Sequence, residues 1–365
     1  MTALKLRPPV PYSPDVEVLQ PDEDIVVQHL SDTFSSIINK THVDLGHASR
    51  SVHAKSHGLL QGELKVHGNL SAELSQGLFH KAKTYPVIIR LSSIPGDPLR
   101  DSVSVPRGIA IKVLEVSGKR LPGSENATTQ DFLMANGPAF AAPTAEKFLG
   151  TLKILAKTTD RAEWAKAALS SVLRPVEKLV EALGGESGLI KTLGGYPKSH
   201  PLGERYFTQA VLRFGDYMAK FDVVPASENF KALEKTSVHI KGRHDALREE
   251  VHNILQKAGG AWTLRAQLCR NLKSNPIEDA SKPWPERGNP YLPVATISVS
   301  AQESWSDEKA KKLEDELAFS PWHGITDHQP LGNVMRARKK TYEAAAQLRS
   351  KLNGCPIHEP RHAAS

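Results

Sequence analysis

Cysteine is scarce in this chain: only Cys269 and Cys355 occur among its 365 residues. The two residues form no Cys-x-x-Cys pair and lack the spacing of zinc ligands, which argues against a metal–thiolate site. So few cysteines are typical of a reducing compartment, where proteins do not depend on disulfides.

Long apolar runs are also missing. No run approaches the roughly 20 residues that a bilayer-spanning helix needs, and the N-terminal segment MTALKLRPPVPYSPDVE lacks the apolar core of a signal peptide. We therefore expect a cytoplasmic protein without a transmembrane segment. The net charge of +7 comes from 47 basic and 40 acidic residues, without a zinc-finger or RNA-recognition signature. A mixed-charge surface with no nucleic-acid partner is the favoured interpretation.

Hydrophobic residues make up 39% of the chain, which is enough for a large buried core. Alternating and β-branched patterns predict strands, and apolar residues at three- and four-residue spacing predict helices. β-hairpins, helices, further β-hairpins and a last helix follow one another, which predicts an α+β fold around an antiparallel sheet or barrel. The expected strands cover 85–93, 108–116, 205–214, 217–224, 262–268 and 293–300; the expected helices cover 23–41, a stretch from Thr144, 161–183, 227–235, 245–258 and 334–352.

The chain divides into three predicted parts: an extended N-terminal arm (1–21), one large domain (22–353) and a flexible tail (354–365). Asn333 is the expected N-cap of the last helix, and Asn353-Gly354 is its expected end. The first helix is expected to bury one apolar stripe, made of Ile25, Leu30, Phe34, Ile37 and Ile38.

Three local patterns could carry chemistry. The first is RSVHAKSHG (50–58), in which His53 directly follows Val52 and stands three residues after Arg50. Histidine can exchange a proton near neutral pH. Most isolated histidines are nevertheless surface or core residues, so this segment alone leaves both interpretations open.

The second pattern is Arg90 and Ser92 on the expected strand 85–93. Residues two apart on a strand point to one side. An arginine inside a barrel needs an anionic partner such as a carboxylate or propionate. The alternative is that these residues lie on the solvent face of a half-buried strand.

The third pattern is RARKKTY (336–342), which places Arg338 and Tyr342 four residues apart on one helix face. A guanidinium beside a phenol favours the phenolate, which is a hard anionic ligand suited to ferric iron. A basic, solvent-facing helix with one aromatic anchor is the alternative, and such a run can also mimic a nucleic-acid patch.

Taken together in chain order, these segments resemble the catalase superfamily, in particular its small catalase-related haem peroxidases. RSVHAK resembles the distal-histidine segment, VIIRLSS the strand with a propionate-binding arginine, and RARKKTY the family's Arg-x-x-x-Tyr. The resemblance implies a catalase-like antiparallel β-barrel with surrounding helices, and haem b with its iron as cofactor. Further matching segments are DSVSVPRGIAIKV (101–113), QDFLMANGPAF (130–140), NPIEDASKPWPE (275–286) and PYLPVATISVSAQ (290–302).

The resemblance implies a role for each matching residue. Tyr342 would be the metal ligand on the proximal side of the haem, and Arg338 would hold it as phenolate. His53 would move a proton between the two peroxide oxygens, so that their bond breaks heterolytically and a ferryl intermediate results. Ser92 would orient the ring of His53.

The remaining implied residues surround the haem. Arg50 and Arg90 would pair with its propionates, and Phe140 could line the distal pocket or be an ordinary core residue. Asn136 is the candidate for the distal asparagine that steadies the peroxide. Larger catalases carry two consecutive asparagines there and use the first, whereas this chain has Ala135 followed by Asn136.

Three reactions fit this resemblance: reduction or dismutation of hydrogen peroxide or organic hydroperoxides, isomerisation or cleavage of fatty-acid hydroperoxides as in allene oxide synthases, or binding of haem or lipid without catalysis. Val52 favours the first, because the allene oxide synthases have a threonine before the distal histidine. An intact set of site residues disfavours the third.

The expected partners are a small peroxide and an organic electron donor, and the sequence leaves open whether the chain forms a homo-oligomer. After Tyr342 the chain continues only from 343 to 365. We therefore expect no additional C-terminal domain of the kind found in large catalases, and a peroxidase activity beside a reduced dismutation.

Overall fold

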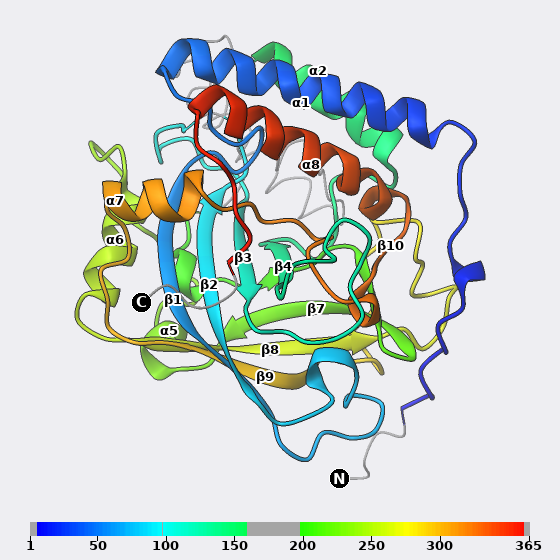
Figure 1. Cartoon of the computed structure of the whole chain (residues 1–365). Helices are drawn as coiled ribbons and strands as arrows, with labels where there is room; N and C mark the ends of the chain where they lie inside the picture. Colours follow the sequence, from blue (N-terminus) through cyan, green and yellow to red (C-terminus); the bar gives the residue numbers. More distant parts are fainter. Residues whose placement is uncertain (1–5, 97, 159–197, 361–365) are drawn as a thin grey trace, which may run out of the picture.

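The computed structural model describes residues 6–96, 98–158 and 198–360 (Figure 1). At its centre the described strands form a closed antiparallel barrel with the order β7-β5-β4-β3-β2-β1-β9-β8, in which β8 pairs again with β7. This ring confirms the expected antiparallel barrel of an α+β fold. Its strands are β1 Ser56–Val66, β2 Thr84–Ser93, β3 Arg107–Val113, β4 Gln130–Ala135, β5 Tyr206–Phe207, β7 Tyr217–Pro225, β8 Gly260–Leu268 and β9 Leu292–Val299.

Three helices, α1 (Glu23–Leu45), α2 (Ala145–Thr158) and α8 (Asn333–Asn353), pack together on one side of the barrel (Figure 1). Their shared apolar cluster includes Leu30 and Phe34 of α1 and Leu149 of α2. Burial of such faces stabilises the layer by about 25 cal/mol per Å² of apolar surface. Shorter elements complete the fold: α5 Glu228–Lys231, α6 Ala246–Leu255, α7 Asp307–Ala310, β6 Val211–Phe214, β10 Pro330–Leu331, a π-helical turn Lys311–Asp315, and 3-10 turns Pro14–Val16, Gly77–Phe79, Pro201–Gly203 and Thr326–His328.

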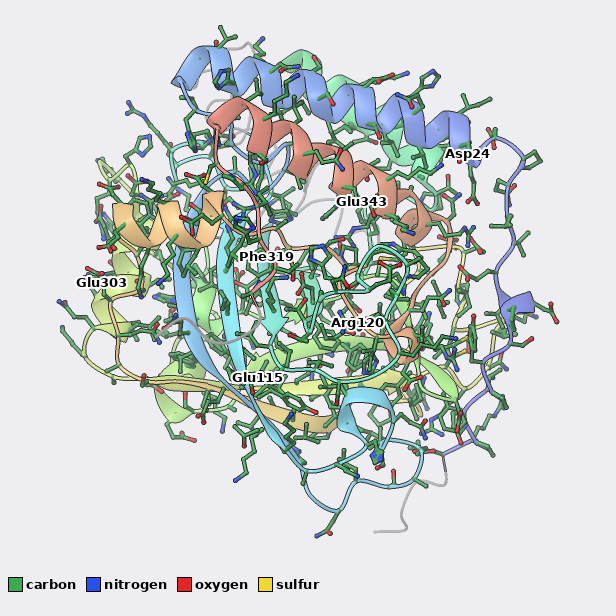
Figure 2. The ribbon with its side chains drawn as sticks, in the orientation of Figure 1. Asp24, Glu115, Arg120, Glu303, Phe319 and Glu343 are labelled. Carbon is green, nitrogen blue, oxygen red and sulfur yellow. The ribbon has the colours of Figure 1, made fainter. Side chains whose placement is uncertain are left out.

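The alternation of side chains along β2 shows on which side of the barrel wall Arg90 lies. Val87, Ile89 and Leu91 belong to the barrel's inner core, whereas Ile88 packs against an outer cluster. That outer cluster includes Phe319, which Figure 2 shows beside β2 and β3. Because side chains alternate along a strand, Arg90 shares the outer face with Ile88. It is neither inside the barrel nor on a solvent face: it is buried beneath the covering chain.

The two long terminal helices form close to where the sequence predicts them, with two corrections. Helix α1 buries Val26, whereas Ile25 is 62% exposed, because a shift of one residue turns a side chain by about 100° around a helix. Gly332, not Asn333, is the N-cap of α8. The Asn333 amide instead accepts a hydrogen bond from the Ala145 N–H at 2.7 Å. Gly354 ends α8 in the left-handed conformation, as expected.

Several strand predictions need correction. Strands β1 and β4 were not expected, because β1 carries two glycines and several polar residues and β4 follows a polar loop. Gly62 of β1 is required by a close approach: a Cβ there would lie 2.3 Å from the Ser298 carbonyl oxygen of β9. The segment expected as one strand over 205–214 is divided into β5 and β6, with Gln209 at a φ of 60° between them. The expected helix 161–183 lies outside the described residues.

Both ends of the described chain pack against the barrel. In the N-terminal arm, the Val10 N–H donates to the Cys269 carbonyl at 2.7 Å. The tail leaves α8 and runs down the barrel past β2 and β3 (Figure 1), where Glu359 accepts a hydrogen bond from Lys112 at 2.9 Å. The described part of the tail is therefore held by specific contacts, while the division into arm, domain and tail stays a prediction.

Within the described ranges, none of the helices combines the length and the apolar character that crossing a membrane demands.

Candidate active site

His53 lies on the short segment between α1 and β1, in an unusual backbone conformation. Its φ is 59°, and its N–H donates to the Ile94 carbonyl at 2.6 Å. A positive φ is uncommon for a residue other than glycine and is often found where a side chain serves a specific function. The ring Nδ1 lies 2.9 Å from the hydroxyl oxygen of Ser92 on β2. The structure thus brings together the two residues that the sequence pairs.

Gly108 on β3 sets the space available to this ring. A Cβ at this position would lie 2.5 Å from Cε1 and 2.9 Å from Nδ1 of His53. Gly108 is paired with Ser92 across the β2–β3 ladder, so the sheet register holds both neighbours of the imidazole. The sequence analysis did not assign Gly108 a role, although it lies in the matched segment 101–113.

The His53 imidazole is neutral at ordinary pH. Burial, helped by the positive charges of Arg90, Arg338 and Arg50, lowers its pKa to about 3. A neutral imidazole can accept a proton. Arg338 belongs to α8, so a positive charge on α8 acts on this ring.

Tyr342 and Arg338 form the expected pair on α8. The Arg338 guanidinium donates from Nη2 to the Tyr342 hydroxyl oxygen at 2.8 Å, and its carbon lies 5.0 Å from the ring centroid. The site therefore contains a tyrosine oxygen that accepts a hydrogen bond from a guanidinium, with both residues on α8.

Arg50 and Arg90 also come together, and their common partner is Glu314. Arg90 Nε lies 2.6 Å from the Glu314 carboxylate, and Arg50 Nη1 lies 3.5 Å from it. A third cation, Arg349, donates to the carbonyl oxygens of Glu314 at 2.5 Å and Leu317 at 2.9 Å. The sequence analysis missed both Arg349 and Glu314. Arg349 could have been found by its spacing, because it follows Tyr342 by about two helical turns.

Asn136 is committed to a different network. Its Oδ1 accepts from the Arg107 N–H at 2.9 Å, and its Nδ2 donates to Glu204 at 3.0 Å. The Arg107 side chain is itself paired with Glu204 and with the Ser199 hydroxyl. Both polar atoms of the Asn136 side-chain amide are thus hydrogen-bonded within the protein, next to the end of β4. A direct contact of Asn136 with peroxide stays a prediction.

Val52 and Phe140 both pack against the layer of helices. Val52 is partly buried against the cluster formed by α1, α2 and α8. Phe140 packs against Phe148 of α2, with ring centroids 4.9 Å apart. Val52, next to His53, connects the site to the helices. Contact of Val52 or Phe140 with a cofactor stays a prediction.

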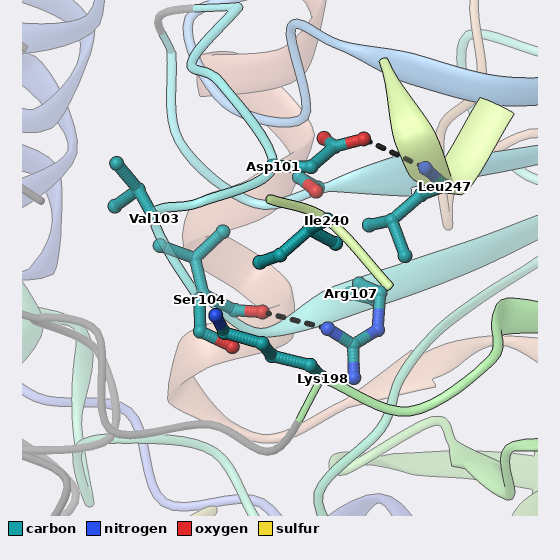
Figure 3. Close-up of a pocket in the computed structure, with 9 residues that line it drawn as sticks. Asp101, Val103, Ser104, Arg107, Lys198, Ile240 and Leu247 are labelled. Carbon is teal, nitrogen blue, oxygen red and sulfur yellow. Dashed lines mark hydrogen bonds between the residues drawn. The ribbon is translucent and has the colours of Figure 1, made fainter. Parts of the chain in front are cut away.

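A small pocket lies on the far side of Arg107 and is distinct from the site (Figure 3). Its lining includes Ser93, Arg107 and Lys198, and Asp101 at its edge accepts from the Leu247 N–H at 2.7 Å. Ser93 also lies 2.7 Å from Nε2 of the buried His57. Because Arg107 belongs to both, the pocket adjoins the Asn136 network.

The donor set fits a haem. A tyrosine oxygen with an arginine partner is a known ligand for haem iron. Arg50, Arg90 and Arg349 outnumber the carboxylates of Glu314 and Asp315, which leaves one positive charge for the propionate edge. Burial and the neighbours Arg90 and Arg349 lower the pKa of Arg50. Since a guanidinium stays protonated in proteins, Arg50 is a buried cation beside two other cations, which a bound anion would stabilise.

The fold is similar to that of solved catalases. No protein-family model matches the chain. A fungal catalase shares 16% identity and a TM-score of 0.59, over 90% of this chain and 70% of the catalase. Catalase A from Saccharomyces cerevisiae shares 16% identity with a TM-score of 0.59, over 85% of this chain and 63% of the catalase. A bacterial catalase shares 15% identity with a TM-score of 0.58, over 98% of this chain and 68% of the catalase.

The chain thus spans 63% of the yeast enzyme's length and somewhat more of the other two. At sequence identities of 15 to 16%, this similarity shows the fold alone. The chain has a catalase-like fold, with an antiparallel β-barrel surrounded by helices.

Proposed function

We propose that the chain is a cytoplasmic, haem-dependent enzyme that reduces or dismutates hydrogen peroxide or organic hydroperoxides. The observation that carries this proposal is the presence of two hydrogen-bonded pairs: His53, just before β1, with Ser92 on β2, and Tyr342 with Arg338 on α8. The positive charge of Arg338 contributes to the lowered pKa of His53, which supports the proposal that both pairs act on one bound group.

The residues that would hold the haem are Tyr342 at the iron and Arg50, Arg90 and Arg349 at its propionates. Val52 and Phe140 are proposed to line it. When bound, haem supplies the redox chemistry that splits the oxygen–oxygen bond. The protein contributes the position of that group and the movement of a proton.

His53 is proposed to accept a proton at its Nε2 from one peroxide oxygen and to return it to the other, leaving oxygen. Ser92 fixes the ring through Nδ1, which leaves Nε2 for the substrate. The low pKa of His53 keeps the ring neutral before the reaction. A protonated ring would be held only briefly, because Arg50, Arg90 and Arg338 disfavour a further cation nearby.

Peroxidase activity with an organic electron donor is proposed beside dismutation. The test is to supply haem to the purified chain and to follow hydrogen peroxide and a fatty-acid hydroperoxide separately, with and without a phenolic donor. We expect consumption of peroxide with oxidation of the donor. Conversion of the fatty-acid hydroperoxide to an isomer would instead indicate an allene oxide synthase-like reaction, and haem binding without turnover would indicate a binding protein.

His53→Ala provides the matched test of the proton step. We expect this variant to bind haem like the wild type and to consume peroxide at least about 100-fold more slowly, as expected for loss of a general acid–base. An unchanged rate of the first reaction with peroxide would refute the role of His53.

A further inference from the structure

Glu314 occupies a buried position between two arginines. Its Oε1 accepts hydrogen bonds from Arg90 Nε at 2.6 Å and lies 2.5 Å from Arg90 Nη2, and its Oε2 accepts from the Ser56 hydroxyl at 3.1 Å. The side chain of Glu314 is only 16% exposed and that of Arg90 3%. Such a pair is strong because little water competes with it.

The backbone that carries Glu314 is held independently of its carboxylate. Glu314 lies on the π-helical turn Lys311–Asp315, a rare conformation that often marks functional sites. Arg50 Nη2 donates to the carbonyl oxygens of Glu314 at 3.0 Å and Leu317 at 3.1 Å. Arg349 donates to the same two carbonyls. The turn therefore has anchors that remain when the carboxylate is changed.

The carboxylate of Glu314 is charged. Burial alone would raise its pKa, but the positive charges of Arg90 and Arg50 outweigh burial and lower it. Arg50 and Arg90 are the residues that, under the proposed function, would pair with the propionates of the haem. Under that function, a carboxylate of the protein and a carboxylate of the cofactor would share one pair of guanidinium groups.

We propose that Glu314 is an internal competitor that weakens binding of the anionic edge of the haem and thereby sets its affinity. The inference rests on the proposed function, because it needs haem at this site. Its physical basis is that a negative charge in contact with Arg90 cancels part of the attraction that Arg90 offers to a propionate and repels that propionate. Glu314 is a positioning residue for the cofactor and takes no part in moving protons.

The test measures haem affinity of the full chain without added peroxide. The cofactor-free protein is titrated with haem, and the absorption change gives the Kd for wild type, Glu314→Gln and Glu316→Gln. Glu316 is the matched control, because it lies two residues away and its backbone carbonyl accepts from the His358 N–H. We expect Glu314→Gln to bind haem at least about tenfold more tightly, and Glu316→Gln to bind like the wild type.

The second arm uses haem dimethyl ester, in which both propionates are uncharged. If Glu314 acts on the anionic edge, Glu314→Gln binds the ester with the wild-type Kd. Equal tightening with haem and ester would overturn the proposal, because it would indicate a change in packing. Unchanged or weaker haem binding by Glu314→Gln would overturn it as well.

Two further results keep the inference separate from the proposed function. Thermal unfolding of the cofactor-free variants establishes whether they are folded. If Glu314→Gln is not folded, Glu314→Asp replaces it; its shorter side chain is expected to give haem binding about threefold tighter than that of the wild type. If Glu314→Asp binds haem no more tightly than the wild type, the inference is overturned. Failure of the wild type to bind either haem or ester refutes the proposed function itself, and the inference with it.

Discussion

Replacement of Gly108 by alanine should disable His53 without touching a haem contact. The added Cβ would lie 2.5 Å from Cε1 of His53, whereas carbon atoms in contact prefer about 3.5–4.0 Å. The ring must therefore move by about 1 Å. It cannot do so freely, because its Nδ1 is hydrogen-bonded to Ser92 at 2.9 Å and its backbone N–H to Ile94.

The expected consequences have different sizes. A displacement of about 1 Å at a reacting group costs about 100-fold in rate, whereas the crowding costs about 1–3 kcal/mol of unfolding free energy. The assay compares peroxide consumption, haem Kd and denaturant unfolding of Gly108→Ala with those of Gly68→Ala, where a Cβ would meet nothing within 4 Å. We expect slow turnover with normal haem binding for Gly108→Ala only. Wild-type turnover by Gly108→Ala would refute the view that this close contact holds His53 in place.

Two remaining predictions concern stability. Burial lowers the pKa of His200 and of His328 from 6.5 to about 4. Between these pH values the unfolded chain therefore binds more protons than the folded chain. The free energy of unfolding should fall as the pH drops from about 6.5 to 4, by up to about 3 kcal/mol for each residue. Urea unfolding at several pH values measures this slope, which His328→Gln should reduce; an unchanged slope would contradict it. Glu359→Gln should lower the free energy of unfolding by about 1–3 kcal/mol, because the buried Lys112 then loses a charged partner. The control, Glu308→Gln at an exposed position, should leave that free energy unchanged. Equal stabilities of the two variants would show that the tail contact contributes little.

The sequence could predict those parts of the site whose partners are close along the chain or follow a strand or helix period. Arg338 and Tyr342 are one helical turn apart, and their contact follows from that spacing. Arg90 and Ser92 share a face because side chains alternate on β2. The ordered motifs then supplied the pairing of Ser92 with His53, which the structure confirms at 2.9 Å.

The sequence could not predict contacts made by distant segments without a motif. Glu314 contacts Arg90 across 224 positions of the chain, from a π-helical turn whose sequence, KKLED, reads as an ordinary amphipathic stretch. The outward direction of Arg90 was likewise undetermined, since alternation gives two faces but does not say which one meets the barrel core. Strand β1 was missed because its glycines and charges obscure its pattern, although Gly62 is required there by the close approach of β9.

The most direct test of the central claim, that Tyr342 holds a haem iron opposite His53, is the absorption and electron paramagnetic resonance spectrum of the haem-supplied chain beside that of Tyr342→Phe. Phenylalanine keeps the ring and removes only the oxygen that Arg338 contacts at 2.8 Å. We predict a high-spin ferric signal with tyrosinate ligation in the wild type, and loss of that signal or of the haem in the variant. Identical spectra from the two proteins would contradict the account.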